Sequence, residues 1–233
     1  MATTMEDIRD DEIIDALHHE AVMKRAALEQ CIYIFVEGES EEATFQTLLE
    51  RCGLDFKEYG IVIANYNGIG NLKHSVRLLG KTLSHDRPII VTYDDDLNGK
   101  RESKSITSPL ITGFKIPITP VVTYSDGSCG GSFEEAFSSS SFLSACFQDG
   151  VLQSSFSGIQ ASFLAIFDET KPWFDQLKRF VKKNGAKVDS IKKVKLAKYM
   201  AESCDPVPTT FVELTKKALE LRKCNPVRHP DEV

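Results

Sequence analysis

The chain has 233 residues, of which 42% are hydrophobic and 27% charged, and its formal net charge is −6. This length fits one medium-sized domain, with or without an extension, and gives enough chain to bury a core. The acidic balance argues mildly against a protein that coats nucleic acid by electrostatics alone.

No apolar run approaches the roughly 20 residues that span a bilayer, and the acidic start of the chain lacks the apolar segment of a signal peptide. The six cysteines are scattered without a C-x-x-C pair. We therefore expect a cytoplasmic protein with no membrane contact, whose cysteines stay reduced and bind no zinc.

The first predicted element is an amphipathic helix over residues 5–28, because apolar residues such as Ile13 and Leu17 fall near helical spacing. Within it, His18 and His19 follow each other directly. Adjacent helical side chains diverge, so we expect both histidines to be solvated rather than to share a metal ion.

Strands and helices then alternate. Strands are predicted at residues 31–36, 61–64 and 89–93, with helices at 41–51 and 72–83. The glycine-rich turn at 65–71 could present backbone N–H groups to a phosphate, although a tight strand-to-helix turn is the more frequent explanation. The alternation predicts a parallel sheet with right-handed crossovers.

The remaining elements are less regular. Residues 97–108 are polar and contain Asn98-Gly99, which predicts an exposed loop. A fourth strand at 116–124 contains two prolines, so we expect it at an edge of the sheet or in an irregular position. Residues 138–162 are rich in serine and phenylalanine, which predicts irregular structure or short helices packed on the domain. Three further helices are predicted at 174–183, 194–202 and 211–222.

The predicted fold is therefore α/β: a mostly parallel, Rossmann-like sheet of about four strands flanked by helices, with a helical C-terminal extension. We divide the chain into an N-terminal helix (1–29), a core (30–138) and a mostly helical extension that completes the site (139–233).

Acidic residues follow two of the buried strands. Glu37 comes directly after the first strand and Glu41 lies in the helix that follows it, while Asp94 and Asp96 end the third strand on one face, with Asp95 pointing away. Ligand sites in such sheets lie beyond the carboxyl ends of the strands, so these acids should converge. They would repel each other without a cation, and hard oxygen ligands suit Mg²⁺ or Mn²⁺. Two such ions could clamp an in-line phosphoryl displacement.

Simpler explanations exist for each feature alone. The aspartates could be a polar strand end, and the glutamates a charge cluster at a helix N-terminus. Lysine-rich residues 171–198 could hold phosphate, although a solvated basic helix is more frequent. Acidic groups that close two buried strands together favour a metal site.

The sequences Val-Glu-Gly-Glu-Ser-Glu at 36–41, Gly-Ile-Gly-Asn at 68–71 and Thr-Tyr-Asp-Asp-Asp at 92–96 together resemble the Toprim domain. This domain is shared by topoisomerases, bacterial primases and the overcoming lysogenization defect (OLD) family nucleases. Residues 54–61 look most like the OLD branch, and the resemblance covers roughly residues 31–200. It implies a Toprim fold for the core.

The resemblance also implies site residues and chemistry. The metal ligands would be Glu37, Glu41, Asp94, Asp96 and Glu134, with Glu37, Asp94 and Lys193 catalytic. Glu135 could replace Glu134, and Lys192 or Lys195 could replace Lys193. Two Mg²⁺ or Mn²⁺ ions would activate water to hydrolyse a DNA or RNA phosphodiester, and the lysine would stabilise charge on the phosphate. Lys100, Arg101, Lys192 and Lys195 are expected to contact the nucleic acid.

Full-length OLD proteins join this domain to an ABC-type ATPase, but the chain has no G-x-x-x-x-G-K-[ST] phosphate loop. We therefore expect a free-standing Toprim unit with a separately encoded ABC-type ATPase, as in two-component anti-phage systems. The alternative is a non-catalytic Toprim module that binds a partner ATPase or nucleic acid. A homo-oligomer also stays open, because the phenylalanines of 142–163 could line an interface, although a core is more frequent.

Overall fold

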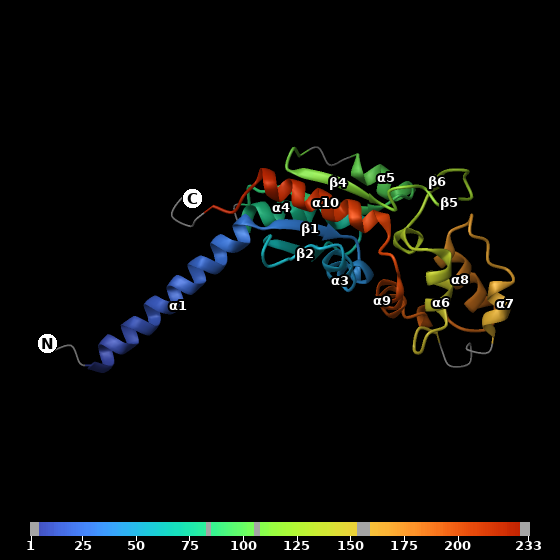
Figure 1. Cartoon of the computed structure of the whole chain (residues 1–233), viewed down its shortest axis with the longest axis horizontal. Coiled ribbons are helices and arrows are strands. Elements are labelled where there is room, and N and C mark those ends of the chain that lie inside the picture. Colours follow the sequence, from blue (N-terminus) through green and yellow to red (C-terminus); the bar gives the residue numbers. More distant parts are fainter. Residues whose placement is uncertain (1–4, 83–84, 105–107, 153–158, 229–233) are drawn as a thin grey trace.

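The structure is a computed structural model that describes residues 5–82, 85–104, 108–152 and 159–228, with side chains described from residue 16 onward. A four-stranded sheet in the order β2-β1-β3-β4 forms its centre, and every neighbouring pair is parallel. Helices flank the sheet, more helices gather beyond its carboxyl end, and α1 projects from the opposite end (Figure 1). The predicted α/β fold is confirmed.

The strands are β1 (Ile32–Val36), β2 (Ile61–Asn65), β3 (Ile89–Asp94), β4 (Ile111–Ile116) and the short antiparallel pair β5 (Val122–Thr123) and β6 (Cys129–Gly130). The helices on or near the sheet are α1 (Met5–Gln30), α2 (Glu39–Glu42), α3 (Phe45–Arg51), η1 (Ile69–Asn71), α4 (Leu72–Thr82) and α5 (Leu97–Ser103). Those of the second half are η2 (Phe133–Ala136), α6 (Ser139–Cys146), α7 (Gln160–Leu164), α8 (Trp173–Lys183), η4 (Val188–Ser190), α9 (Lys193–Ser203) and α10 (Thr209–Cys224).

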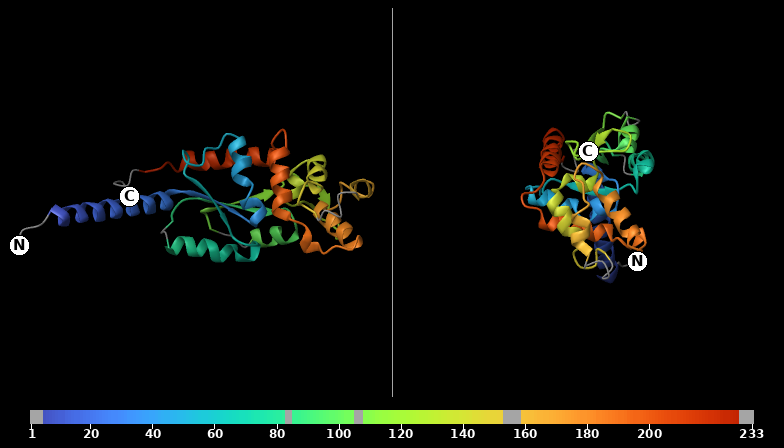
Figure 2. Two further views of the ribbon diagram at one scale, coloured as in Figure 1. Left: turned by 90° about the horizontal axis from the view of Figure 1, so that it is seen from below. Right: turned by 90° about the vertical axis from the view of Figure 1, so that its right-hand side faces the viewer.

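Alternate residues of β1 point to opposite faces of the sheet, and both faces are buried. Ile34 belongs to the large apolar cluster that also contains Leu48 of α3 and Leu214 of α10. Tyr33 belongs to the smaller cluster that contains Leu72 of α4. Because a strand of period two supplies one face with each alternate residue, an unbroken apolar run is what a strand buried on both faces requires. Figure 2 shows the helices on both sides of the sheet.

The prediction of an exposed loop at 97–108 is wrong for the first half of this range, where the chain forms α5. The side chain of Asp96 caps this helix by accepting a hydrogen bond from the Gly99 backbone N–H at 2.7 Å. Gly99 does not mark a turn: a Cβ atom there would lie 2.0 Å from the carbonyl oxygen of Asp94. The glycine permits a close approach of two backbone segments.

The fourth strand was predicted at 116–124 but lies at Ile111–Ile116, at an edge of the sheet beside β3. It ends before Pro117, because proline has no N–H to donate to a strand ladder. Only Val122–Thr123 within the rest of the predicted range forms a strand, paired with β6.

Two predicted helices differ in detail. The helix expected at 41–51 is split into α2 and α3 around Thr44, whose hydroxyl donates to the Ser40 carbonyl at 2.7 Å and offers the backbone an alternative to a continuous helix. The N-terminal helix exists, but the part of it whose side chains are described, from residue 16 onward, does not bury an apolar face. Leu17 and Val22 are 61% and 48% exposed, because α1 leaves the body of the molecule (Figure 1). His18 and His19 are exposed, as predicted.

The helices after residue 138 share one apolar core with the sheet. Phe142 of α6, Leu177 of α8 and Leu196 of α9 are buried in the same cluster as β1. Phe163 is fully buried as well, so Phe142 and Phe163 of the phenylalanine-rich stretch contribute to the core, whereas Phe156 lies outside the described residues. The division of the chain at residue 138 stays a prediction. Within the described part of the chain, no helix has the length and apolar character needed to cross a membrane.

Candidate metal centre

The ends of β1 and β3 lie side by side and are tied together beneath the site. The Thr92 hydroxyl of β3 donates to the Phe35 carbonyl of β1 at 3.1 Å. The hydroxyl of Tyr66, a buried residue that follows β2, donates to the Thr92 carbonyl at 2.7 Å. These bonds fix the strand ends from which Glu37 and Asp94 project.

The glycine-rich turn after β2 closes one side of this region. The Gly68 N–H donates to the Glu37 carbonyl at 2.8 Å, and Gly68 has a φ of 95°. A glycine adopts such a φ without steric cost. The turn therefore lies beside Glu37 and shares a hollow of about 430 Å³ with Glu41, Asp94 and Lys193.

The three consecutive aspartates have different surroundings. Asp94 accepts a hydrogen bond from the Phe133 N–H at 3.0 Å. Asp95 is buried on the other side, where Lys100 and Lys115 lie 3.2 and 3.4 Å from its carboxylate oxygens. Asp96 caps α5. The prediction that Asp95 points away from its two neighbours is confirmed.

The two glutamates of η2, Glu134 and Glu135, are both buried but have different partners. Glu134 faces Lys193, with its Oε1 atom 3.3 Å from the lysine Nζ, and its other oxygen accepts from the Ser132 hydroxyl at 2.8 Å. Glu135 instead accepts from the N–H groups of Ser132 and Trp173, both at 2.7 Å. Of the two glutamates left open by the sequence, Glu134 is the one that joins the site.

Lys193 is the first residue of α9, and its ammonium group lies among carboxylates. Its Nζ atom is also 5.3 Å from the centre of the Phe174 ring. The charge of Glu134 has the largest effect on its pKa and raises it, with further contributions from Glu41 and Asp94, so the ammonium stays protonated. We call Glu37, Glu41, Asp94 and Glu134 the acid cluster.

Burial and mutual repulsion act together on the acid cluster. Burial is the main cause that raises the pKa values of Glu37, Glu41 and Asp94. For Asp94 the charges of Glu41, Glu134 and Glu37 raise the pKa further, and Lys193 only partly offsets them. Asp96 raises the pKa of Glu37, which places it at the Glu37 side of the cluster.

The donor set suits a hard divalent cation. In the part of the chain that the structure describes, the four carboxylates of the acid cluster face one ammonium group, that of Lys193, so the cluster carries an excess of negative charge that such a cation would offset. Among the described residues, no three His, Cys, Asp or Glu side chains are already arranged to hold one ion together. The acid cluster therefore supplies the ligand chemistry, and side-chain rotation would have to complete the coordination shell.

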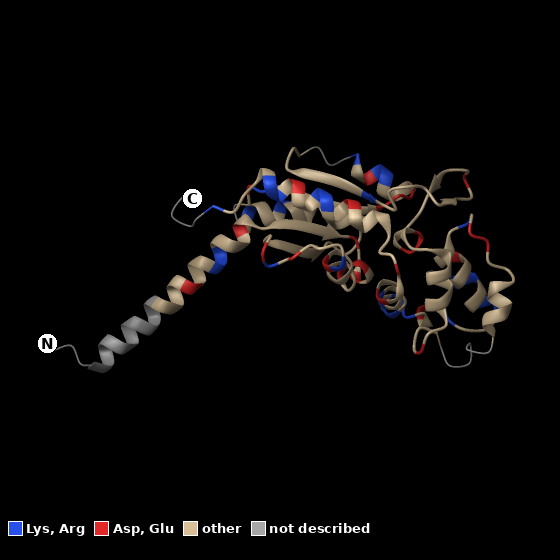
Figure 3. Ribbon diagram, viewed as in Figure 1, with Lys and Arg blue, Asp and Glu red and all other residues tan. Residues whose placement is uncertain are grey.

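The four basic residues predicted to bind nucleic acid occupy two places. Lys100 donates to the Cys129 carbonyl at 2.7 Å in addition to its ion pair with Asp95, and Arg101 pairs with Glu102 at 3.0 Å. Lys192 and Lys195 flank Lys193 at the start of α9. Figure 3 shows basic residues on both α5 and α9. Their role toward nucleic acid stays a prediction.

Three contributors to the site were not singled out from the sequence. Tyr66 ties the strands, Ser132 orients Glu134, and Phe174 contacts Lys193. A tyrosine inside a turn rich in asparagine and glycine is unusual and could have indicated Tyr66. The other two are brought in by η2 and α8, whose positions the local sequence does not encode.

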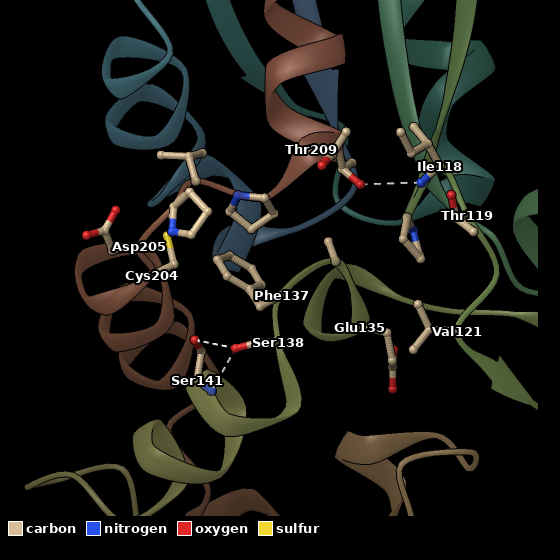
Figure 4. Close-up of a pocket in the computed structure, with 16 residues that line it drawn as sticks. Ile118, Thr119, Val121, Glu135, Phe137, Ser138, Ser141, Cys204, Asp205 and Thr209 are labelled. Carbon is tan, nitrogen blue, oxygen red and sulfur yellow. Dashed lines mark hydrogen bonds between the residues drawn. The ribbon is translucent and has the colours of Figure 1, made fainter.

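A second hollow lies on the Glu135 side of η2 (Figure 4). It is bordered by the segment after β4 and by the proline-rich segment before α10. The Ile118 N–H donates to the Thr210 hydroxyl across it at 3.4 Å. Lys193 and the acid cluster do not line this hollow, so it is separate from the candidate metal centre.

Comparison with known proteins identifies the domain that carries Glu37, Glu41 and Asp94 of the acid cluster. Residues 32–96 match the family model described as overcoming lysogenization defect protein-like, TOPRIM domain. No curated protein matches the chain.

Solved structures of two OLD proteins are similar to the chain. The C-terminal region of the Burkholderia pseudomallei OLD protein is 14% identical, with 82% of this chain and 98% of that chain covered and a TM-score of 0.46. The C-terminal region of the Xanthomonas campestris pv. campestris OLD protein is 17% identical, with 88% of this chain and 97% of that chain covered and a TM-score of 0.49. The match over residues 32–96 assigns that part of the chain to the OLD-like Toprim domains, which belong to a family of nucleases.

Proposed function

We propose that the protein is a metal-dependent nuclease that hydrolyses phosphodiester bonds of DNA or RNA with two Mg²⁺ or Mn²⁺ ions. The observation that carries this proposal is the convergence of the acid cluster and Lys193 at the carboxyl end of the sheet. The match to an OLD-like Toprim domain supports it, because Toprim domains generally bind divalent metal ions.

Each residue of the site has a distinct task in this proposal. Glu37, Glu41, Asp94 and Glu134 would hold the ions, and Asp96 would be a further ligand on the Glu37 side. Divalent ions bound there would supply Lewis-acid activation of water and neutralise charge on the phosphate. Lys193 carries a fixed positive charge into the same hollow and would stabilise the negative charge that develops on the scissile phosphate.

A cleavage assay tests the proposal. The purified chain is incubated with supercoiled plasmid and with tRNA, in Mg²⁺ and in Mn²⁺. Asp94→Asn is the main variant, since an amide oxygen can still accept from the Phe133 N–H while the charge is lost. Glu42→Gln is the matched control, because Glu42 is exposed beside Glu41 and bonds Asn65 instead. We expect metal-dependent cutting that Asp94→Asn abolishes and Glu42→Gln leaves unchanged. Cutting that persists in Asp94→Asn would overturn the assignment.

The second candidate function is a non-catalytic Toprim module that binds a partner ATPase or nucleic acid. One observation favours it: the described carboxylates are not preset in a ligating arrangement. It predicts no cleavage by the wild type with either metal, and undiminished binding by Asp94→Asn.

We further propose a cytoplasmic setting and a separately encoded ABC-type ATPase as the partner, with the pair acting as a two-component anti-phage defence system. The match to an OLD-like Toprim domain supports the ATPase partner, because full-length OLD proteins join such a domain to an ABC-type ATPase. Co-purification of the chain with ATPases encoded beside it, followed by a phage plaque assay with each component deleted, tests this. Full protection by the chain alone would remove the need for the ATPase.

A further inference from the structure

A third cavity, which we call the cleft and which is distinct from the two hollows described above, lies between the segment that follows β5 and the start of α8. It has a volume of about 400 Å³, which is within the usual range for small-ligand sites. Tyr124 lines one wall, and Lys171, Gln176 and Arg179 line the other. The Thr123 N–H donates to the Thr170 carbonyl at 2.8 Å, which holds the two walls together.

Both walls are attached to the elements that build the candidate metal centre. Strand β5 pairs with β6, and the Gly131 N–H just after β6 donates to the Asp95 carbonyl at 3.3 Å, between the two site aspartates. On the other wall, the first N–H of α8, from Trp173, donates to Glu135, the neighbour of Glu134. Hydrogen bonds therefore connect both walls of the cleft to direct neighbours of Asp94 and Glu134 in the sequence.

The charges in the cleft leave one cation available. Lys171 pairs with Asp168 at 2.7 Å and Asp175 pairs with Lys178 at 2.5 Å. The Gln176 amide is also engaged, since it donates to the Asp168 carbonyl at 2.8 Å. Arg179 is exposed, and no ion pair with another described residue is formed by its guanidinium group. A guanidinium group presents several N–H donors in a planar fork that fits phosphate.

Tyr124 provides an aromatic surface opposite this arginine. Its side chain is half-buried, and its hydroxyl makes no hydrogen bond with the described part of the chain. Burial raises the pKa of Tyr124 and the nearby charges of Glu135, Asp96 and Asp94 raise it further, so the hydroxyl remains a donor. An aromatic ring and a phosphate-binding cation within one nucleotide-sized cleft are the features that bind unpaired nucleotides.

We propose that this cleft binds one nucleotide of a single-stranded segment that flanks the cleavage position, with the base stacked on Tyr124 and a phosphate bound by Arg179. The inference rests on the proposed nuclease function for its substrate. It specifies that substrate further: the enzyme would favour nucleic acids with an unpaired flank, since a base stacked inside a duplex offers no free face to Tyr124.

Binding is measured by fluorescence anisotropy on the full chain, with a labelled single-stranded DNA, the RNA of the same sequence and a blunt duplex, all in Ca²⁺. Gels verify that the strands stay intact, and thermal melting verifies that each variant is folded. Tyr124→Leu removes the ring, whereas Tyr124→Phe keeps the ring and removes only the hydroxyl. Arg179→Gln is compared with Lys183→Gln, which makes the same change of charge further along α8 and outside the cleft.

We expect Tyr124→Leu to weaken binding of a single strand about 10-fold and Tyr124→Phe to weaken it about 2-fold at most. Arg179→Gln should lower the slope of log affinity against log salt by about 1. Unchanged single-strand binding by folded Tyr124→Leu would overturn the inference, as would an equal loss for the duplex or an equal effect of Lys183→Gln.

The outcomes separate this inference from the proposed function. If the wild type cuts nucleic acid but Tyr124→Leu binds normally, the cleft proposal fails and the nuclease stands. If the expected binding losses occur but the wild type never cuts, the nuclease fails and the cleft remains a nucleotide-binding site.

Discussion

The ammonium group of Lys193 lies 3.3 Å from the carboxylate of Glu134, although one residue starts α9 and the other belongs to η2. Glu134 is 2% exposed, and Lys193 is the cation beside it. The contact therefore connects the helical part of the chain with the site at the end of the sheet. Lys193 neutralises a buried acid, and in the proposed function it would also bring positive charge to a substrate.

These two tasks predict the behaviour of Lys193→Gln. Cleavage should fall at least 100-fold, because the stabilising charge at the phosphate is lost. The free energy of unfolding in EDTA should fall by about 1–2 kcal/mol, which is less than for a fully buried pair because the lysine side chain is 42% exposed. Urea denaturation measures this change in the free energy of unfolding.

Lys192→Gln is the control. The Lys192 side chain makes no described ion pair with Glu134, so the stability of this variant should stay within about 0.5 kcal/mol of the wild type. A Lys193→Gln protein with normal activity would contradict the assigned role.

Removing one charge from the acid cluster should separate stability from activity. In the metal-free protein, Asp94→Asn relieves repulsion with Glu41 and Glu37, so we expect its stability to equal or exceed that of the wild type by up to about 1 kcal/mol. Cleavage should nevertheless be lost. Urea denaturation in EDTA, with and without excess Mg²⁺, measures the free energy of unfolding of both proteins. Mg²⁺ should raise it more for the wild type than for Asp94→Asn. A marked loss of metal-free stability would show that Asp94 is held by favourable contacts instead.

The close approach of the Gly130 backbone to the backbone of Asp95 predicts that Gly130→Ala strongly lowers the stability of the protein. A Cβ atom at Gly130 would lie 1.8 Å from the Asp95 carbonyl oxygen, so the backbone would have to move. We expect a loss of at least about 2 kcal/mol of stability, together with reduced cleavage. Gly80→Ala is the control, because its Cβ would meet nothing within 4 Å and the residue lies in α4. There we expect a gain of up to about 1 kcal/mol. Thermal melting compares the two, and equal effects would contradict the packing argument.

His85 predicts a dependence of stability on pH. It is buried and packs edge-on against Tyr33, with 5.2 Å between ring centres, and burial lowers its pKa. The folded protein thus binds a proton at His85 less readily than the unfolded chain, whose pKa is near 6.5. The contribution of neutral His85 to the free energy of unfolding is fully present above pH 6.5. It is lost as the pH falls from 6.5 through the pKa of His85 in the folded protein. Between pH 7 and pH 5, stability of the wild type should fall more than that of His85→Leu. Equal slopes in urea denaturation would contradict this.

The local sequence predicts the part of the site that depends on the two central strands. Glu37 and Asp94 each end an apolar run long enough for one strand, and parallel strands bring such ends together. Asp94 and Asp95 separate because side chains alternate along an extended backbone. These relations follow from strand geometry alone.

The sequence predicts the surrounding elements less well because distant contacts decide them. Asn98-Gly99 has the composition of a turn, but capping by Asp96 and the close approach to Asp94 make it helical. Likewise, the choice of Glu134 over Glu135 depends on where α8 and α9 lie. Neither of these helices is adjacent to η2 in the sequence.

The central claim is that the acid cluster is a site for divalent metal ions. Anomalous diffraction from crystals grown with Mn²⁺ tests it most directly. If the acid cluster binds metal, manganese peaks should lie within ligand distance of Glu37, Glu41 and Asp94, and no such peaks should appear in Asp94→Asn crystals. A wild-type site in which Lys193 remains the only cation beside these carboxylates at saturating Mn²⁺ would contradict it.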